Sequence, residues 1–331
     1  MKKLFYSLVF LLMSGFIFMA CSNEDEIVMQ EESSLSSKAL TRSASMRRSL
    51  TSQEAAELKA IFPNLNTKNV IVTGEATRTY NCIAYSMGIT NKWINPEFYY
   101  NDFIDQYKNA KSWYGASLNY EQTSTQGSGA DVDGWGLNIS NMTHGSVIYS
   151  SNTWESKLGQ SLRITHGRAE LSSSTYGDIL VSFVKSNSKM SNLKKVAEEV
   201  SKEDIVLSDL ERNRVLEESR KVNSEIVDKF ESLVSEWENE IQINPQTKFS
   251  ASTLDYKKLP QFKSLQEMGR VIMPLIMEKL LDENNFFMLS LYDALQVDST
   301  LKVVYSKSDP KCLEGEQNRA RRTIRMWINS L

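Results

Sequence analysis

The chain has 331 residues, of which 41% are hydrophobic and 24% are charged, and this composition is typical of a folded soluble protein. Its 38 basic and 41 acidic side chains give a net charge of −3, so no global positive field favours a nucleic acid partner. The sequence contains no Cys-x-x-Cys, His-Glu-x-x-His, acidic calcium loop, phosphate loop or dinucleotide fingerprint. We therefore expect no metal and no cofactor.

Residues 1–20 have the pattern of a bacterial lipoprotein signal peptide. Two lysines precede an apolar run that ends in Phe18-Met19-Ala20-Cys21, which is similar to a lipobox. We expect cleavage before Cys21 and attachment to a membrane through acyl chains on that cysteine. A plain signal peptide or a single anchor helix is the alternative. The acidic residues that follow Cys21 favour the outer membrane and exposure at the cell surface.

Residues 21–49 are rich in Ser, Thr and charged residues and hold few large apolar groups. Such a segment cannot bury enough surface to order itself, so we expect a disordered tether.

Residues 50–185 predict an α+β domain with helices in front and strands behind. Thr51-Ser52-Gln53-Glu54 is a capping box that opens a helix ended by Pro63, and a second helix is expected through Phe103 and Ala110. The segment from Gln122 to Gly136 is rich in Gly, Ser and Thr, and we expect a loop over a cleft. Short β-rich runs then predict an antiparallel meander, namely residues 145–150, 161–165 and 176–184.

The chemistry of the chain is predicted to centre on Tyr80-Asn81-Cys82-Ile83-Ala84-Tyr85. The preceding run, which begins at Val70, predicts a strand and a polar turn, and Gly88 is placed to end a short helix that starts near Cys82. A thiol at a helix start lies in the positive field of the free N–H groups, which favours the thiolate. Cys82 is therefore a candidate nucleophile.

The only two histidines, His144 and His166, follow Cys82 in strand-like segments. If the site is catalytic, Cys82 is the nucleophile, His144 the general base and His166 the group that orients the base. The oxyanion hole would use the Cys82 N–H with Tyr80 or Asn81. The alternative is a buried structural cysteine with two histidines satisfied at strand ends.

Six separated motifs occur in order between residues 60 and 185. They are Tyr80-Asn81-Cys82-Ile83-Ala84-Tyr85, Trp93-Ile94-Asn95-Pro96, Thr143-His144, Trp154-Glu155-Ser156-Lys157-Leu158-Gly159, Ile164-Thr165-His166 and Tyr176-Gly177. This order resembles an uncharacterised bacterial domain family, in which alanine often stands at the position of Gly145. Its Cys, His and His layout is similar to that of NlpC/P60-type papain-like peptidases, which implies a papain-like fold. The glutamine of papain's oxyanion hole is missing, since Ala76 stands six residues before Cys82.

Two further residues in this domain have competing interpretations. Lys157 could contact a substrate carboxylate, but a tight turn between strands is the favoured interpretation. Trp154 is expected in the core or in a cleft wall. A disulfide between Cys82 and Cys312 is an alternative for two thiols on an oxidising side of a membrane.

Residues 186–331 predict an α-helical domain. Apolar positions from Leu193 to Trp237 follow helical spacing, Asn244-Pro245 interrupts it, and a kink is expected at Pro274. The segment that follows Pro260 resembles a small helical module appended to various bacterial proteins. The basic run Arg319, Arg321, Arg322 and Arg325 is expected to be a solvated helix face rather than a nucleic acid site.

The sequence therefore supports two main functional hypotheses. The first is a membrane-anchored thiol hydrolase or acyl transferase that acts on an amide bond in a peptide or in peptidoglycan. The second is a non-enzymatic binding or adaptor lipoprotein with a structural cysteine. A toxin-like effector or its immunity partner is a third class.

Overall fold

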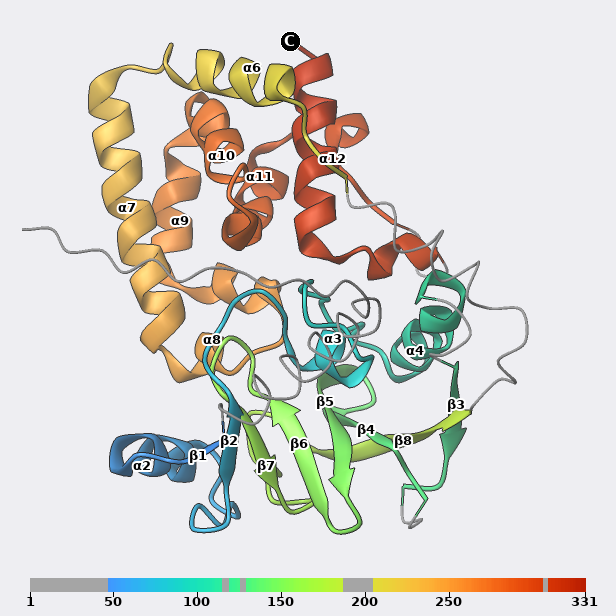
Figure 1. Cartoon of the computed structure of the whole chain (residues 1–331). Helices are drawn as coiled ribbons and strands as arrows, with labels where there is room; N and C mark the ends of the chain where they lie inside the picture. The colour runs from blue at the N-terminus through green and yellow to red at the C-terminus, as the bar shows by residue number, and fades with distance from the viewer. Residues whose placement is uncertain (1–46, 115–118, 126–128, 187–204, 306–308) are drawn as a thin grey trace, which may run out of the picture. The chain divides into compact units, whose positions relative to one another are not determined.

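The computed structural model describes residues 47–114, 119–125, 129–186, 205–305 and 309–331 (Figure 1). The expected signal peptide, Cys21 and nearly all of the expected tether lie outside these residues. Met46–Leu331 form one compact unit. No helix within the ranges listed above combines the length and the apolar character needed to cross a bilayer.

The described part of the chain contains an eight-stranded antiparallel sheet, which confirms the expected α+β class. The strand order is β1-β2-β7-β6-β5-β4-β8-β3, so β4 to β7 form a meander and β8 returns beside β4. The strands are β1 (Arg48–Ser49), β2 (Ile71–Gly74), β3 (Asn119–Thr123), β4 (Val132–Asn138), β5 (Asn141–Ser150), β6 (Thr153–Lys157), β7 (Arg163–His166) and β8 (Asp178–Ser186).

The strand β1 falls at the end of the expected tether. Arg48 and Ser49 pair with Val72 and Ile71 of β2, and the Arg48 guanidinium forms ion pairs with both Glu54 and Glu75. Arg48 and Ser49 are therefore ordered, and the chain joins the sheet before residue 50.

Three helices precede or interrupt the strands: α2 (Ser52–Ile61), α3 (Cys82–Ser86) and α4 (Tyr100–Tyr114). The predicted capping box is present, since Thr51 accepts from the Glu54 N–H and Glu54 accepts from the Thr51 N–H. Cys82 is the first residue of α3, as expected, and Gly88 has φ 81° just after its end.

The expected loop between Gln122 and Gly136 is wrong at both of its ends, and residues 126–128 lie outside the described part of the chain. Residues up to Thr123 belong to β3, and β4 starts at Val132 and lies inside the sheet between β5 and β8. Its glycines make room for neighbours, because a Cβ on Gly134 would lie 2.6 Å from the Phe103 ring and one on Gly136 would lie 2.8 Å from Leu180. At these two positions of β4, glycine therefore reflects close packing.

The C-terminal half is helical over the described residues. Its α-helices are α6 (Asp209–Ser219), α7 (Ser224–Ile243), α8 (Pro245–Lys248), α9 (Pro260–Glu267), α10 (Met273–Lys279), α11 (Leu289–Leu295) and α12 (Gly315–Asn329). Short 3-10 helices join them: η2 (Thr253–Lys258), η3 (Gly269–Ile272), η4 (Glu283–Met288), η5 (Ser299–Leu301) and η6 (Pro310–Leu313).

The expected kink at Pro274 is not a kink in one helix. The chain leaves α9 at Gly269, which has φ +74°, passes through η3 and starts a new helix, α10, with Pro274 in its first turn. Proline is favoured there because the first-turn N–H groups have no partner within the helix.

The two halves share their cores. Trp93, from the sheet half, is buried in the cluster of the helical region and lies 5.4 Å from the Phe286 ring. Phe249 and Ala251, from the helical half, are buried in the two clusters of the sheet half. The domain boundary between residues 185 and 186 stays a prediction, but the contacts cross it in both directions.

Candidate functional site

Cys82 lies at the start of α3 and is completely buried. Its surroundings are mainly apolar side chains of α3, α4 and the sheet. Burial raises the pKa of the Cys82 thiol to about 12, against weaker opposite effects of the Gly145 backbone and the Lys157 charge. This direction is opposite to that of the thiolate expected at the helix start, and desolvation is its largest cause.

His144 and His166 are brought together, with Ser156 between them. Ser156 Oγ lies 3.0 Å from His144 Nε2 and 2.8 Å from His166 Nε2. Burial lowers the pKa of His166 to about 4 and that of His144 well below its ordinary value. Both rings are therefore neutral near pH 7.

The hydrogen-bond directions in this network follow from its last acceptor. His166 Nδ1 lies 2.7 Å from Gly167 O, which can only accept, so Nδ1 carries the proton and Nε2 accepts from Ser156. Ser156 must then accept from the Nε2–H of His144. His144 Nδ1 is left as a buried lone pair, and no described residue donates to it.

The structure does not bring Cys82 to either histidine. A Cβ on Gly145 would lie 2.7 Å from Ser86 of α3, so this residue of β5 faces α3. The preceding residue, His144, points to the opposite face of the sheet, because neighbouring residues of a strand alternate between its two faces. There it stacks on Tyr176 with ring centroids 3.9 Å apart. The expected Cys82, His144 and His166 triad is therefore not assembled in this structure.

The two oxyanion candidates are also occupied. Asn81 is completely buried, caps α3 by accepting from the Ala84 N–H, and donates its amide to Ile94 O and Ala251 O. Tyr80 is 8% exposed, and its hydroxyl lies 3.4 Å from an Arg163 nitrogen. Neither group is free to bind an oxyanion beside Cys82.

A polar cluster on the α3 face of the sheet was not anticipated from the sequence. The Tyr85 hydroxyl donates to Glu155, whose carboxylate lies 3.4 Å from Arg163, and the Arg163 guanidinium lies over the Tyr85 ring at 4.9 Å. Burial raises the pKa of Tyr85, and the Glu155 charge acts in the same direction. Because successive residues of β6 alternate between the two faces of the sheet, Glu155 and Ser156 lie on opposite faces. This alternation is the feature of the sequence from which the polar cluster could have been predicted.

Lys157 is at the end of β6 rather than in a turn, and its side chain is completely buried. Its ammonium donates to Thr77 O, Gly159 O and Ser161 O at 3.1, 2.7 and 2.6 Å. Burial lowers its pKa to about 7, but three acceptors match the three donors of the charged form. Lys157 therefore holds two loops together and cannot reach a substrate in solvent.

A cleft of about 610 Å³, here called the sheet cleft, opens beside the sheet. It lies between the β4–β5 turn, the loop before β8 and the segment that joins α8 to α9. Two apolar residues on its walls are partly exposed, Leu137 at 46% and Leu254 at 43%. Its polar lining consists of Ser140, Asn141, Thr143, Ser174, Thr175, Gln246, Ser250, Ser252, Asp255 and Lys258.

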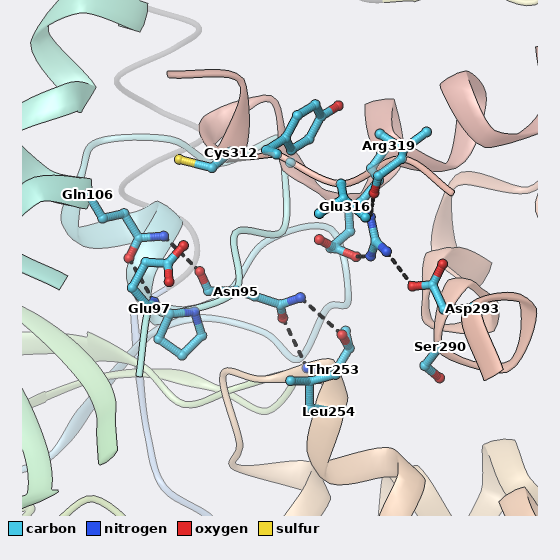
Figure 2. A pocket seen from close by; sticks show the side chains of 15 residues that line it. Asn95, Glu97, Gln106, Thr253, Leu254, Ser290, Asp293, Cys312, Glu316 and Arg319 are labelled. Carbon is cyan, nitrogen blue, oxygen red and sulfur yellow. Dashed lines mark hydrogen bonds and ion pairs between the residues drawn. The ribbon is translucent and has the colours of Figure 1, made fainter. Parts of the chain in front are cut away.

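A second cleft of about 390 Å³, the helix cleft, shares Pro96 and Leu254 with the first. Figure 2 shows Arg319 of α12 between the Asp293 and Glu316 carboxylates on one wall of this cleft. On the other wall, Asn95 donates to the Thr253 hydroxyl at 3.0 Å. The partly buried Cys312 also lines this cleft, and burial raises the pKa of its thiol to about 12.

Cys82 and Cys312 are both free thiols, so the alternative of a disulfide between them is not present here. Within the described ranges, no group of three or more His, Cys, Asp or Glu side chains could hold a metal ion.

The basic run on α12 is not a simple solvated face. Each of its four arginines forms an ion pair with an acidic residue, and three of these acids lie on other segments. The pairs are Arg319 with Asp293 and Glu316, Arg321 with Glu283, Arg322 with Glu314, and Arg325 with Glu211. These charges tie α12 to its neighbours and leave little positive field for a nucleic acid.

Residues 71–184 match the model of one protein family, described as a Domain of unknown function (DUF7689). The match spans less than half of the 331 residues and contains all six motifs. No curated protein matches the chain. No solved structure matches it either.

Proposed function

We propose that the protein is a non-enzymatic binding module in which Cys82 is structural and the sheet cleft, with the adjoining helix cleft, receives the ligand. The observation that carries this proposal is the burial of Cys82, away from His144, while the motif residues Asn81, Lys157 and Tyr176 bond to backbone carbonyls. These motif groups are used to hold backbone segments of the fold together, which favours a structural role for them.

The lining of the sheet cleft favours a polypeptide ligand. Its many hydroxyl and amide groups suit the hydrogen bonds of a peptide backbone, and the exposed parts of Leu137 and Leu254 suit apolar side chains. A sugar ligand usually stacks on a fully exposed aromatic face, whereas the two aromatic residues of this lining are the buried Tyr176 and the half-buried Phe98. Peptide recognition is therefore the better match.

A selection of displayed random peptides tests this function. We expect peptides selected on the wild-type protein to lose binding at least tenfold when Leu137 and Leu254 are both changed to Lys. The matched control is Val297→Lys, because Val297 is 76% exposed and lines neither cleft. Peptides that bind all three proteins equally would contradict a site in the cleft.

Thiol hydrolysis or acyl transfer in a papain-like fold stays a prediction from the sequence. Alkylation of Cys82 tests it. A catalytic Cys82 would react rapidly with iodoacetamide at pH 6, because it would be a thiolate there. We expect mass spectrometry of the native protein to find Cys82 unmodified at pH 6. The urea-unfolded protein, in which both thiols are accessible, treated above the ordinary thiol pKa of about 8.5, is the positive control. Rapid modification of Cys82 would restore the hydrolase hypothesis.

We further propose that the mature chain is an outer membrane lipoprotein held by lipid on Cys21, on the strength of the lipobox-like sequence. Metabolic labelling with a fatty acid and membrane fractionation should show the wild type labelled and membrane-bound. Cys21→Ser should be unlabelled and released. An unlabelled wild type would contradict the proposal.

A further inference from the structure

The segment Lys248–Thr253, which we call the docking segment, leaves the helical half and crosses the sheet half. Its backbone carbonyls accept hydrogen bonds from three residues of the sheet half. These bonds run from Gln160 N to Lys248 O at 3.1 Å, from Tyr176 Oη to Phe249 O at 2.9 Å and from Asn81 Nδ2 to Ala251 O at 2.8 Å. Because carbonyls are present in every residue, this pattern recognises a backbone rather than one particular sequence.

Two side chains of the docking segment are buried in separate cores. Phe249 is completely buried, with its ring edge-on to Phe62 at a centroid distance of 5.8 Å. Ala251, two residues later, is 1% exposed and belongs to the cluster that contains Cys82. The sheet half therefore offers one socket for an aromatic side chain and a tighter one for a small side chain.

Gly159 shapes the floor beneath the segment. It has φ +51°, and a Cβ there would lie 2.6 Å from Lys248 O and 2.7 Å from Ser250 O. No side chain fits between these two backbones.

Most of the groups that contact the docking segment come from the motifs. Asn81, Gly159 and Tyr176 each belong to one of them, and Asn95 of a fourth motif accepts from the Thr253 N–H at 3.0 Å. The family match, however, ends at residue 184, well before the segment begins. We infer that the matched region is a receptor for a polypeptide segment with an aromatic residue followed two positions later by a small one. In this chain Lys248–Thr253 fills that receptor in cis.

A fluorescent peptide of residues 244–256 tests this inference on the full chain. The peptide should bind the Phe249→Ala chain, whose aromatic socket is empty, at least tenfold more tightly than the wild type, whose socket is filled. Tyr176→Phe in the Phe249→Ala background should weaken binding about fivefold, through one lost hydrogen bond. A peptide that itself carries Phe249→Ala should bind at least tenfold more weakly.

Equal binding to both chains, or no binding to a Phe249→Ala chain that keeps the wild-type circular dichroism, would overturn the inference. If Phe249→Ala fails to fold, hydrogen exchange on two glycine variants decides. Gly159→Ala should speed amide exchange in residues 249–252 at least tenfold. Gly269→Ala is the matched control, since its φ is +74° but no atom lies within 4 Å of its Cβ position. Equal exchange in the two variants would overturn the inference.

This inference does not depend on the proposed function. Ser250 and Ser252 line the sheet cleft, so an undocked segment would also remove one wall of that cleft. Displayed peptides that fail to bind the cleft would leave the trans-binding result unaffected.

Discussion

Lys157 shows how one buried side chain can organise a motif without taking part in chemistry. Its ammonium replaces water for three carbonyls that come from before α3 and from the loop after β6. Each of those carbonyls would be unsatisfied without it, and a buried unsatisfied acceptor costs about 1–3 kcal/mol. The sequence placed Lys157 within a motif, but it did not indicate that the side chain is buried.

We therefore expect Lys157→Met to lower the free energy of unfolding by about 3 kcal/mol or more, as measured by urea denaturation. Lys263→Met is the matched control, because the Lys263 side chain is 82% exposed and should change stability by less than about 0.5 kcal/mol. Equal effects of the two substitutions would show that the three carbonyls find other partners.

The two histidines make stability depend on pH. Their folded pKa values lie below that of a free histidine, so the unfolded state binds more protons at mildly acidic pH. Their contribution is complete above about pH 6.5, and it is lost as the pH falls, for His166 down to about pH 4. Each histidine should contribute a slope of up to about 1.4 kcal/mol per pH unit.

Urea denaturation at pH 7.5, 6.5, 6.0 and 5.5 measures that slope above the ordinary pKa range of carboxylates. His166→Gln should reduce the slope by about half, because the chain has only two histidines. An unchanged slope would mean that other groups carry the pH dependence.

The approach of α3 to β5 depends on Gly145. Ser86 of α3 and Tyr107 of α4 are hydrogen-bonded at 2.5 Å directly over this glycine, and a Cβ would lie within 2.7 Å of both.

Gly145→Ala should destabilise the protein by about 1–3 kcal/mol through overpacking, as measured by thermal denaturation. Adding Ser86→Ala should recover part of that loss, because it removes the Ser86 Oγ that lies 2.7 Å from the Cβ position. Two losses that simply add would show that the crowding is not at Ser86.

The helical half and the sheet half act as one structure. Gln317 of α12 accepts from the Trp93 N–H and donates to Thr79 O, and Arg78 forms an ion pair with Glu238 of α7. Together with Phe249 and Trp93, these contacts place each half inside the core of the other.

We expect a single unfolding transition for this unit. Urea curves from far-ultraviolet circular dichroism, which is dominated by the helices, should coincide with those from tryptophan fluorescence, which also reports Trp135 and Trp154 of the sheet. Two separated transitions would instead support the boundary predicted at residue 185.

The sequence by itself determined the local features, because these depend on neighbouring residues. The capping box at Thr51, the helix that starts at Cys82, the stop at Gly88 and the antiparallel class all follow from spacing and turn residues. Only the tertiary structure decided the site. The tertiary structure places His144 on one face of β5, buries Cys82, and brings acceptors to Lys157 and carboxylates to the α12 arginines. Such contacts join segments far apart in the sequence, as Asn81 and Ala251 do across 170 residues. Burial raises the pKa of the Cys82 thiol, whereas its position at a helix start predicted a lowered pKa, because desolvation by a packed core is the largest effect on this group.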